Sequence, residues 1–206
     1  MDVEFPRLGN TNNSWTDYLI TRRLGVQSRA AAPPYFVDVH WWPPVNHWMK
    51  VNTDGSALGA PGSISAGGGG VFRDKWAAVR GCFHVKGGLG FAFEAELLAV
   101  ITAINIAHSR GWRFLWVESD SSYVVNLLNS RSEDVPWRFV ASWKSALRIL
   151  PEFNIMVTHI YREGNSPVDI MANGERTEGW WPYPIDEIKK AVALDMATHS
   201  HTRMVK

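Results

Sequence analysis

The strongest constraint on the fold is the segment 93–111, FEAELLAVITAINIAHSRG, which is long, apolar and helical in pattern. Its Ala, Leu and Ile residues cover most of the circumference of a helix, so such a helix must be buried on more than one side. Two cations, His108 and Arg110, precede Gly111, an order typical of a helix C-terminus. We therefore expect a central helix between other layers, and we expect its residue Leu98 to be buried.

Short segments on both sides of this helix are typical of β-strands, because they are apolar with an alternating pattern. Three of them precede the helix, at 47–56, 69–74 and 76–85, and their short connections predict an antiparallel meander. Two more, at 113–120 and 153–162, follow the helix. Helical segments separate these two strands, so we expect both to lie parallel to the first strand and beside it.

Further helical segments complete an order of β-β-β-α-β-α-α-β-α, which predicts an α/β domain over residues 47–174. Residues 1–46 carry two proline pairs and are interpreted as an N-terminal arm or linker. Residues 175–206 are interpreted as a C-terminal extension with a short helix. The flanks contain the pairs Trp41–Trp42 and Trp180–Trp181, so we expect them to pack against something.

The composition is that of a globular chain, with 46% hydrophobic and 20% charged residues. The net charge of +1 means that any binding of nucleic acid must depend on a local patch. One cysteine, Cys82, excludes an intramolecular disulfide and a multi-cysteine zinc site. It fits a reducing compartment, so we expect an intracellular protein of the nucleus or cytoplasm. No apolar run approaches the ~20 residues of a membrane span, so we expect no membrane insertion.

Four acidic residues occupy related positions in this pattern: Asp54 at the end of the first strand, Glu96 early in the long helix, Asp120 after the fourth strand and Asp169 near the start of the last helix. Each by itself is typical of a turn or a helix start. Together they are expected to meet beyond the carboxyl ends of the parallel strands, where sites form in open α/β sheets. Glu94 competes with Glu96, but two residues apart on a helix they face nearly opposite sides.

The negative charges of four neighbouring carboxylates must be neutralised. Two unit charges ~4 Å apart interact by roughly 4 kcal/mol at an effective dielectric constant of ~20. Protons or cations must offset that repulsion. Carboxylate oxygens suit Mg²⁺ or Mn²⁺, and two such ions ~3.5–4 Å apart can clamp an in-line displacement at phosphorus.

Five motifs, in this order, resemble the successive motifs of the ribonuclease H domain: KVNTDGS, GGGVFRD, EAELLAVITAINIA, VESDSSYVV and HIYREGNSPVDIMA. The most similar form is the reverse-transcriptase-like domain of plant non-LTR retrotransposons and their domesticated relatives. The resemblance spans Trp41 to Gly174. It implies a ribonuclease H-like fold with a five-stranded mixed sheet in the order 3-2-1-4-5 and helices on both faces. It also implies Mg²⁺-dependent endonucleolytic hydrolysis of the RNA strand of an RNA–DNA hybrid by two metal ions.

The same resemblance implies site residues by position. Asp54, Glu96, Asp120 and Asp169 match the four metal-binding acids of the family. His159 matches a histidine that aids proton transfer or product release, although a histidine that only packs in its strand remains an equal alternative. We predict contacts to substrate from Gly55, Ser56, Ser122, Asn126, Arg162 and Asn165. Candidate phosphate contacts are Lys50, Arg73, Arg80, Lys86, Lys144 and Arg162, although a basic residue more often lies on a solvated face.

Two departures leave alternatives open. The link between the second and third helices is short, so the basic protrusion that grips hybrids in some bacterial forms is missing. Val168 stands where alanine is usual. Because the protrusion is missing, we expect a low affinity for hybrids unless another domain assists, such as an upstream reverse transcriptase. We also expect the chain to be a monomer. The alternatives are a nuclease with another substrate and a non-catalytic module that binds nucleic acid or protein.

Overall fold

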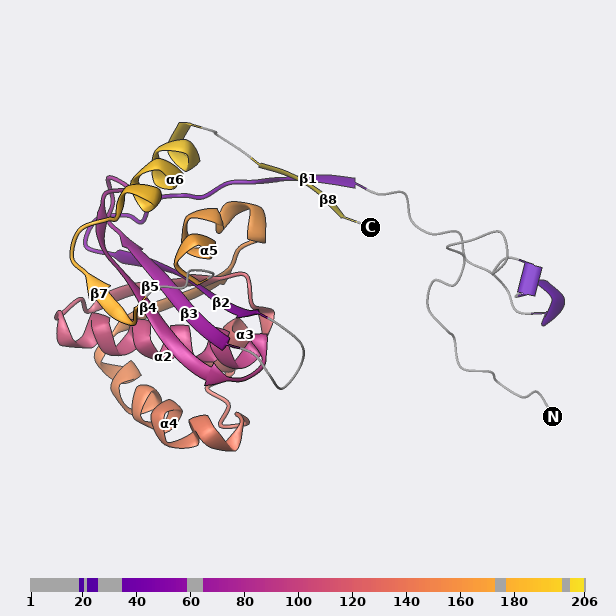
Figure 1. Cartoon of the computed structure of the whole chain (residues 1–206), viewed down its shortest axis with the longest axis horizontal. Coiled ribbons are helices and arrows are strands. Elements are labelled where there is room, and N and C mark those ends of the chain that lie inside the picture. The colour runs from indigo at the N-terminus through magenta and orange to yellow at the C-terminus, as the bar shows by residue number, and fades with distance from the viewer. Residues whose placement is uncertain are drawn as a thin grey trace. The chain divides into compact units, whose positions relative to one another are not determined.

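The computed structural model describes residues 19–20, 22–25, 35–58, 65–172, 177–197 and 201–205. The chain divides into two compact units, one formed by Asp38–Thr202 and one by Met1–Val37 with Arg203–Lys206. The larger unit contains every element from β2 to α6 (Figure 1). A separate two-stranded sheet pairs β1 (Tyr35–Val39) with β8 (His201–Val205).

The main sheet has six strands in the order β6-β5-β2-β3-β4-β7. Their bounds are β2 Met49–Leu58, β3 Ser65–Arg73, β4 Val79–Leu89, β5 Phe114–Ser119, β6 Asn154–His159 and β7 Gly179–Trp181. Strands β2, β5 and β6 are parallel, whereas β3, β4 and β7 join by antiparallel pairing. The five predicted strands therefore have the predicted neighbours and the predicted parallel or antiparallel pairing. Strand β7 adds a sixth strand beside β4 at the edge of the sheet.

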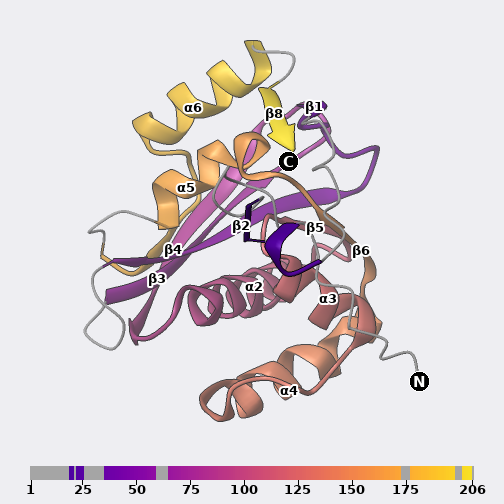
Figure 2. The same ribbon diagram turned by 90° about the vertical axis from the view of Figure 1, so that its right-hand side faces the viewer.

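Five helices cover the two faces of this sheet, as predicted. They are α2 (Ala92–Ser109), α3 (Ser122–Ser130), α4 (Val140–Ile149), α5 (Ser166–Ala172) and α6 (Asp186–Ala197). Figure 2 shows α2, α3 and α4 on one side of the sheet and α5 and α6 on the other. Helix α2 ends before Gly111, whose φ of +69° is the left-handed conformation expected just beyond a helix.

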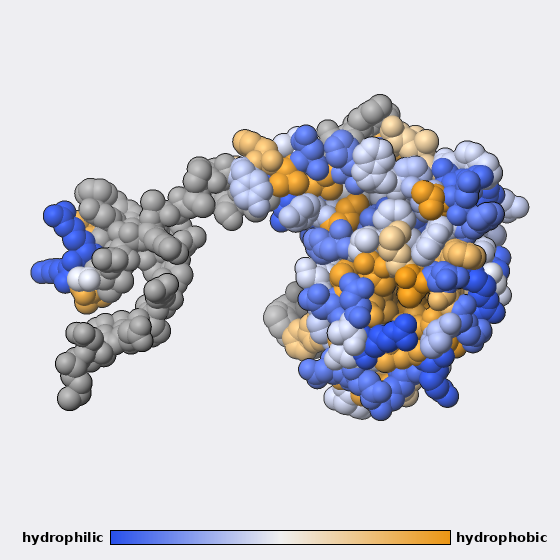
Figure 3. All heavy atoms as spheres, turned by 180° about the vertical axis from the view of Figure 1, so that it is seen from behind, coloured by the Kyte–Doolittle hydropathy of each residue, from blue (hydrophilic) through white to orange (hydrophobic). Residues whose placement is uncertain are grey.

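The apolar core lies between the sheet and the α2 layer. Fully buried residues of α2 include Leu97, Val100 and Ile104, and they pack against Val51 of β2 and Leu115 of β5. By length and composition alone α2 could cross a membrane, but the core helix of a soluble domain meets the same criteria, and half of this helix is buried inside the structure. Seen from behind, hydrophilic side chains cover most of the surface of the larger unit and surround an apolar patch (Figure 3).

The prediction that Leu98 is buried is wrong, because Leu98 is only half-buried and its neighbour Leu97 is fully buried. We expect Leu97→Ala to lower the free energy of unfolding by about 2–5 kcal/mol, the range for a truncated core leucine. Leu98→Ala should cost less, since part of its side chain already contacts water. Urea denaturation of both variants checks this, and equal losses for the two would contradict the assignment.

A second, smaller core lies between the sheet and α5 and α6. It contains Val71 and Cys82 from the sheet, Met171 from α5 and Ile188 from α6. The domain limits at 47 and 174 remain a prediction from sequence. The structure adds that the described part of the C-terminal extension packs against the body, since β7 joins the sheet and α6 packs against α5.

Glycines in β3 permit this double coverage. A Cβ atom on Gly68 would lie 2.8 Å from the Cβ atom of Ala99 in α2, and one on Gly69 would lie 2.6 Å from the Cβ atom of Met171 in α5. Both distances are too short for real side chains. Strand β3 can therefore be sandwiched between two helices only because these positions have no side chain.

Candidate metal centre

Asp54 and Asp120 occupy equivalent positions on neighbouring parallel strands. The parallel ladder between β2 and β5 ends with Thr53 opposite Ser119, and each aspartate is the next residue. The two carboxylates therefore leave the sheet side by side. The prediction that the first strand ends at Asp54 needs correction, because β2 continues to Leu58 and Asp54 still pairs with Gly69 of β3.

The third carboxylate, that of Glu96, lies close to Asp54 because α2 approaches β2 at Gly55. A Cβ atom at Gly55 would lie 2.1 Å from the backbone nitrogen of Glu96, so α2 can approach β2 this closely only at a glycine. Glu94 is used elsewhere: its carboxylate accepts a hydrogen bond from the Phe91 amide at 2.9 Å and pairs with Arg138. The choice of Glu96 over Glu94 agrees with this geometry.

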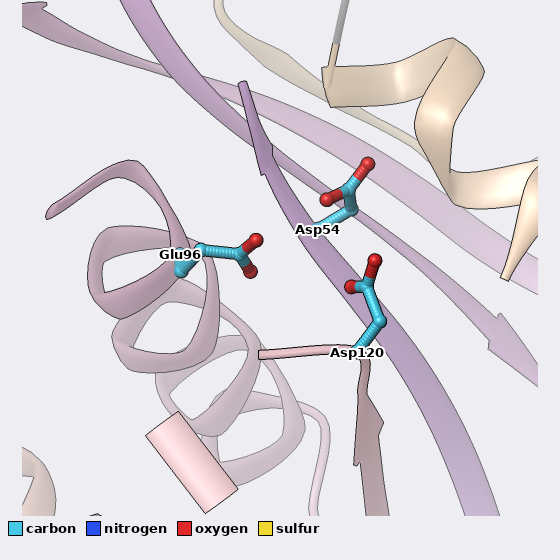
Figure 4. A group of neighbouring side chains, drawn as sticks. All are labelled: Asp54, Glu96 and Asp120. Carbon is cyan, nitrogen blue, oxygen red and sulfur yellow. The ribbon is translucent and has the colours of Figure 1, made fainter. Parts of the chain in front are cut away.

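Asp54, Glu96 and Asp120 form one group. Each offers a carboxylate oxygen, and these oxygens lie within 4.8 Å of one another. Figure 4 shows the three side chains extending from β2, from α2 and from the end of β5 toward a common space. Asp54 is buried with 6% of its surface exposed, whereas Glu96 and Asp120 are half-buried. Three carboxylates therefore converge at one point, one of them buried and two of them partly accessible to solvent.

The electrostatics of the group favour a bound cation. Burial, followed by repulsion from Asp120 and Asp169, raises the pKa of Asp54 to about 7. Burial and repulsion from Asp54 and Asp120 raise the pKa of Glu96 to about 9. Burial also raises the pKa of Asp120. The Oε2 atom of Glu96 is buried without a hydrogen-bond partner among the described residues. An oxygen-only donor set with an unpartnered buried oxygen fits Mg²⁺ or Mn²⁺.

Asp120 is held from two sides. The Nδ2 atom of Asn165 donates to its Oδ1 atom at 3.1 Å, and the Nε2 atom of His159 lies 3.1 Å from its backbone oxygen. His159 is exposed at the end of β6, beside the acid group. Asn165 is 1% exposed. The prediction that Asn165 contacts substrate is therefore wrong: its side chain is inside the protein and donates a hydrogen bond to Asp120.

Asp169 lies outside the group of three. Its Oδ1 atom accepts a hydrogen bond from the guanidinium of Arg162 at 2.9 Å, and both residues are at the surface. Its charge nevertheless reaches the group, because Asp169 contributes to the raised pKa of Asp54. Its role as a fourth metal ligand stays a prediction, and so does a contact between Arg162 and substrate.

The other predicted contacts divide into two classes. Gly55 and Ser56 are next to Asp54 in β2, and Ser122 and Asn126 are exposed on α3, which begins two residues after Asp120; their contacts to substrate stay predictions. Among the basic residues, Lys86 is exposed, and Arg80 and Lys144 form ion pairs at the surface.

Lys50 and Arg73 are wrong as phosphate contacts, because they are 1% and 0% exposed. The Nζ atom of Lys50 pairs with Glu118 at 2.8 Å, and Arg73 pairs with Asp195 at 2.7 Å. The ring of Trp41 lies against both cations, 3.4 Å from the Arg73 guanidinium carbon and 4.9 Å from the Lys50 Nζ atom. The flanking tryptophan thus packs on buried charges of the sheet.

Sequence reasoning missed Asn52, which is buried at the centre of this polar layer. A signal was present in the sequence: Lys50, Asn52 and Asp54 alternate along β2 and therefore share one face. Three polar residues on one face of a central strand predict either a solvated face or a buried polar network. The pattern does not distinguish these two possibilities.

The raised pKa values predict that the metal-free protein becomes less stable as the pH rises. In the unfolded chain Asp54 loses its proton near pH ~4, whereas in the folded protein it does so at about 7. Between these values the folded state binds more protons, so the free energy of unfolding falls with increasing pH. Above about 8 the lowered pKa of Lys50, caused by burial, acts in the opposite direction.

Urea denaturation in a chelator, between about pH 5 and 7.5, measures this slope. Added Mg²⁺ should restore more stability at the upper end of the range than at the lower end, because the ion binds the ionised carboxylates. A metal-free stability that rises over this range would contradict the electrostatic account.

Comparison with known proteins shows which family the chain resembles in sequence. The model of the family described as reverse transcriptase-like matches residues 52–174, which contain all three acids of the group. The chain belongs to this family. It contains a ribonuclease H-like domain, as the resemblance of its motifs implied.

One curated relative resembles the chain in sequence, and two solved structures resemble it in fold. A protein of Arabidopsis thaliana named "Putative ribonuclease H protein" is 33% identical over 136 residues, which cover 66% of this chain and 22% of that protein. The crystal structure of LC11-RNase H1 in complex with an RNA/DNA hybrid has a TM-score of 0.51 at 23% identity, over 60% of this chain and 92% of that one. The protease–reverse transcriptase of prototype foamy virus has a TM-score of 0.51 at 26% identity, over 60% of this chain and 20% of that one.

Proposed function

We propose that this protein is a metal-dependent endonuclease that hydrolyses the RNA strand of RNA–DNA hybrids. The observation that carries the proposal is the convergence of Asp54, Glu96 and Asp120, whose carboxylate oxygens lie within 4.8 Å of one another. Such a group is costly in a folded protein unless cations neutralise it. The family membership and the hybrid bound by LC11-RNase H1 support the choice of substrate.

The three acids would hold the metal, with Asp169 as a fourth ligand at the rim. Bound Mg²⁺ or Mn²⁺ would supply an activated water and stabilisation of the leaving oxygen at phosphorus. Asp54, the most buried of the three, would be a ligand common to both cations if two are bound. Glu96 contributes the oxygen that has no partner among the described residues.

Other residues around the group would handle the substrate and the proton. His159 is exposed next to Asp120, so its ring can carry a proton between the site and solvent. We expect the 2′-hydroxyl groups in the minor groove of a hybrid to contact residues that neighbour Asp54 and Asp120 in the sequence, namely Gly55, Ser56, Ser122 and Asn126. Arg162 can contact phosphate if it exchanges its present partner Asp169 for the substrate.

The partners follow from the same reasoning. The matched foamy-virus protein contains a reverse transcriptase, and our match covers 20% of that chain, so we propose that an upstream reverse-transcriptase domain can assist hybrid binding. A monomeric state and a location in the nucleus or cytoplasm remain predictions from sequence.

The direct test is cleavage of a labelled RNA–DNA hybrid with Mg²⁺, next to single-stranded RNA, single-stranded DNA and DNA duplex of the same sequence. We expect cleavage of the RNA strand of the hybrid only, loss of cleavage in a chelator, and loss in Asp120→Asn. Equal cleavage by wild type and Asp120→Asn would contradict a metal-dependent nuclease at this site. Tight binding of the hybrid without cleavage would favour the non-catalytic module, and preferential cleavage of another substrate would favour a different nuclease.

A further inference from the structure

A chain of buried and partly buried hydrogen bonds connects Trp41 in the N-terminal flank to Asp120 of the acid group, and Asn52 is its first buried amide. The Oδ1 atom of Asn52 accepts a hydrogen bond from the Nε1 atom of Trp41 at 2.8 Å and another from Arg73 at 2.9 Å. An indole N–H and a guanidinium can only donate. The amide of Asn52 therefore has one permitted orientation, with its oxygen toward these two donors and its Nδ2 atom on the other side.

The orientation of the Asn52 amide in turn determines the orientation of the Asn165 side-chain amide. The Nδ2 atom of Asn52 donates to Glu118 and to the Oδ1 atom of Asn165, both at 3.0 Å. The Oδ1 atom of Asn165 must then face Asn52, which leaves its Nδ2 atom to donate elsewhere. It donates to the backbone oxygen of Thr53 at 3.0 Å and to the Oδ1 atom of Asp120 at 3.1 Å.

We propose that Trp41, Arg73, Asn52 and Asn165 form a relay that holds the Asp120 carboxylate in its metal-binding orientation. Asn165 and Asn52 are positioning residues, since both are 1% exposed and act through Asp120. If the Asn52 amide were reversed, its nitrogen would face two donors and its oxygen would face the Asn165 oxygen. The relay thus selects one arrangement of the acid group among those that the backbone allows.

The relay extends beyond the part of the chain that matches the family. Trp41 precedes the matched range of 52–174, and Arg73 is held by Asp195, which follows it. The ring of Trp41 stacks on the guanidinium of Arg73 at 3.4 Å, so the two flanks meet over one buried cation. The flanks therefore contribute to the orientation of a metal ligand and not only to packing.

This proposal rests on the proposed metal site, and calorimetric titration with Mg²⁺ separates the two. Asn165→Ala removes the donor to Asp120 and should weaken Mg²⁺ affinity by about 10–100-fold, the usual effect of losing an outer partner of a metal ligand. Trp41→Phe removes one N–H and keeps a ring on Arg73, and it should weaken affinity in the same direction by a smaller factor.

Two control variants exclude general effects. Trp42 is exposed and accepts a hydrogen bond from Lys50 through its backbone oxygen, which Trp42→Phe does not change. The Mg²⁺ affinity of this variant should therefore equal that of wild type. Leu97→Ala destabilises the core without touching the relay, and at a temperature where it stays folded its affinity should also be unchanged. Wild-type affinity in folded Trp41→Phe would overturn the relay while leaving the metal site in place. Absence of Mg²⁺ binding by wild type would overturn both proposals.

A measurement on the unmutated protein keeps the proposal testable if Trp41→Phe does not fold. In an NMR titration with Mg²⁺, the indole N–H signal of Trp41 and the side-chain amide signals of Asn52 and Asn165 should shift together at the affinity found by calorimetry. The indole signal of Trp76, an exposed residue outside the relay, should not shift. A Trp41 signal that is insensitive to Mg²⁺ would contradict the relay.

Discussion

Asp54→Asn should abolish Mg²⁺-dependent cleavage while leaving the metal-free protein at least as stable as wild type. The substitution keeps the shape of the side chain and removes its charge. Even the loss of an outer partner of a metal ligand costs about 10–100-fold, so the loss of the most buried ligand should reduce the cleavage rate by more than about 100-fold. The stability effect has the opposite sign, because the substitution removes repulsion of Glu96 and Asp120.

Cleavage of a labelled hybrid and urea denaturation in a chelator measure the two effects. The gain in stability should be larger at about pH 7.5 than at about pH 5, where Asp54 of the wild type still carries its proton. The pKa of Glu96 should move back toward its ordinary value, since repulsion from Asp54 is, after burial, the largest cause of its rise. A variant that loses activity only because it unfolds would refute this account.

Asp195→Ala should lower the free energy of unfolding by about 3–5 kcal/mol, the cost of leaving one partner of a buried ion pair without the other. The side chains of Arg73 and Asp195 are 0% and 2% exposed, and their charged atoms lie 2.7 Å apart. Burial lowers the pKa of Arg73, but a guanidinium does not release its proton at neutral pH. Without Asp195 a positive charge would remain inside the protein with Asn52 as its remaining hydrogen-bond acceptor among the described residues.

A matched control lies on the same helix. Asp186 of α6 pairs with Lys189 at the surface, and its side chain is 83% exposed. Asp186→Ala should leave the unfolding curve unchanged, since exposed pairs contribute little. Thermal and urea denaturation of both variants check the difference. If Asp195→Ala were as stable as Asp186→Ala, the buried pair between β3 and α6 would not exist in solution.

Much of the fold could be predicted because its signals are local. The apolar circumference of α2, the glycine after it and the strand patterns depend on neighbouring residues, and they predicted the order of elements and the central helix. The positions of Asp54 and Asp120 followed from the rule that sites form beyond parallel strands. Burial within α2 was less predictable: Leu97 and Leu98 are both apolar, and only the packing of the surrounding elements decides which of them is inside.

The acidic residues of the site could be predicted from the sequence, but the residues that hold them in position could not. Gly55 was predicted as a substrate contact, yet a glycine is required there because any Cβ atom would lie 2.1 Å from the backbone of α2. Asn165 was predicted at the rim and lies inside. Both cases have the same origin, because a residue beside a site can face the substrate or support the site, and the two roles have the same local pattern.

By itself, the sequence determined the α/β class, the succession of strands and helices, and the acids that meet at the end of two parallel strands. Tertiary structure alone decided that Lys50 and Arg73 are buried, that β7 joins the sheet, and that Trp41 connects through Asn52 to Asp120. The reason is the separation of the partners along the chain. Periodicity along a strand reports which residues share a face, but Arg73 and Asp195 are 122 positions apart, and their pairing exists only after the helices have packed.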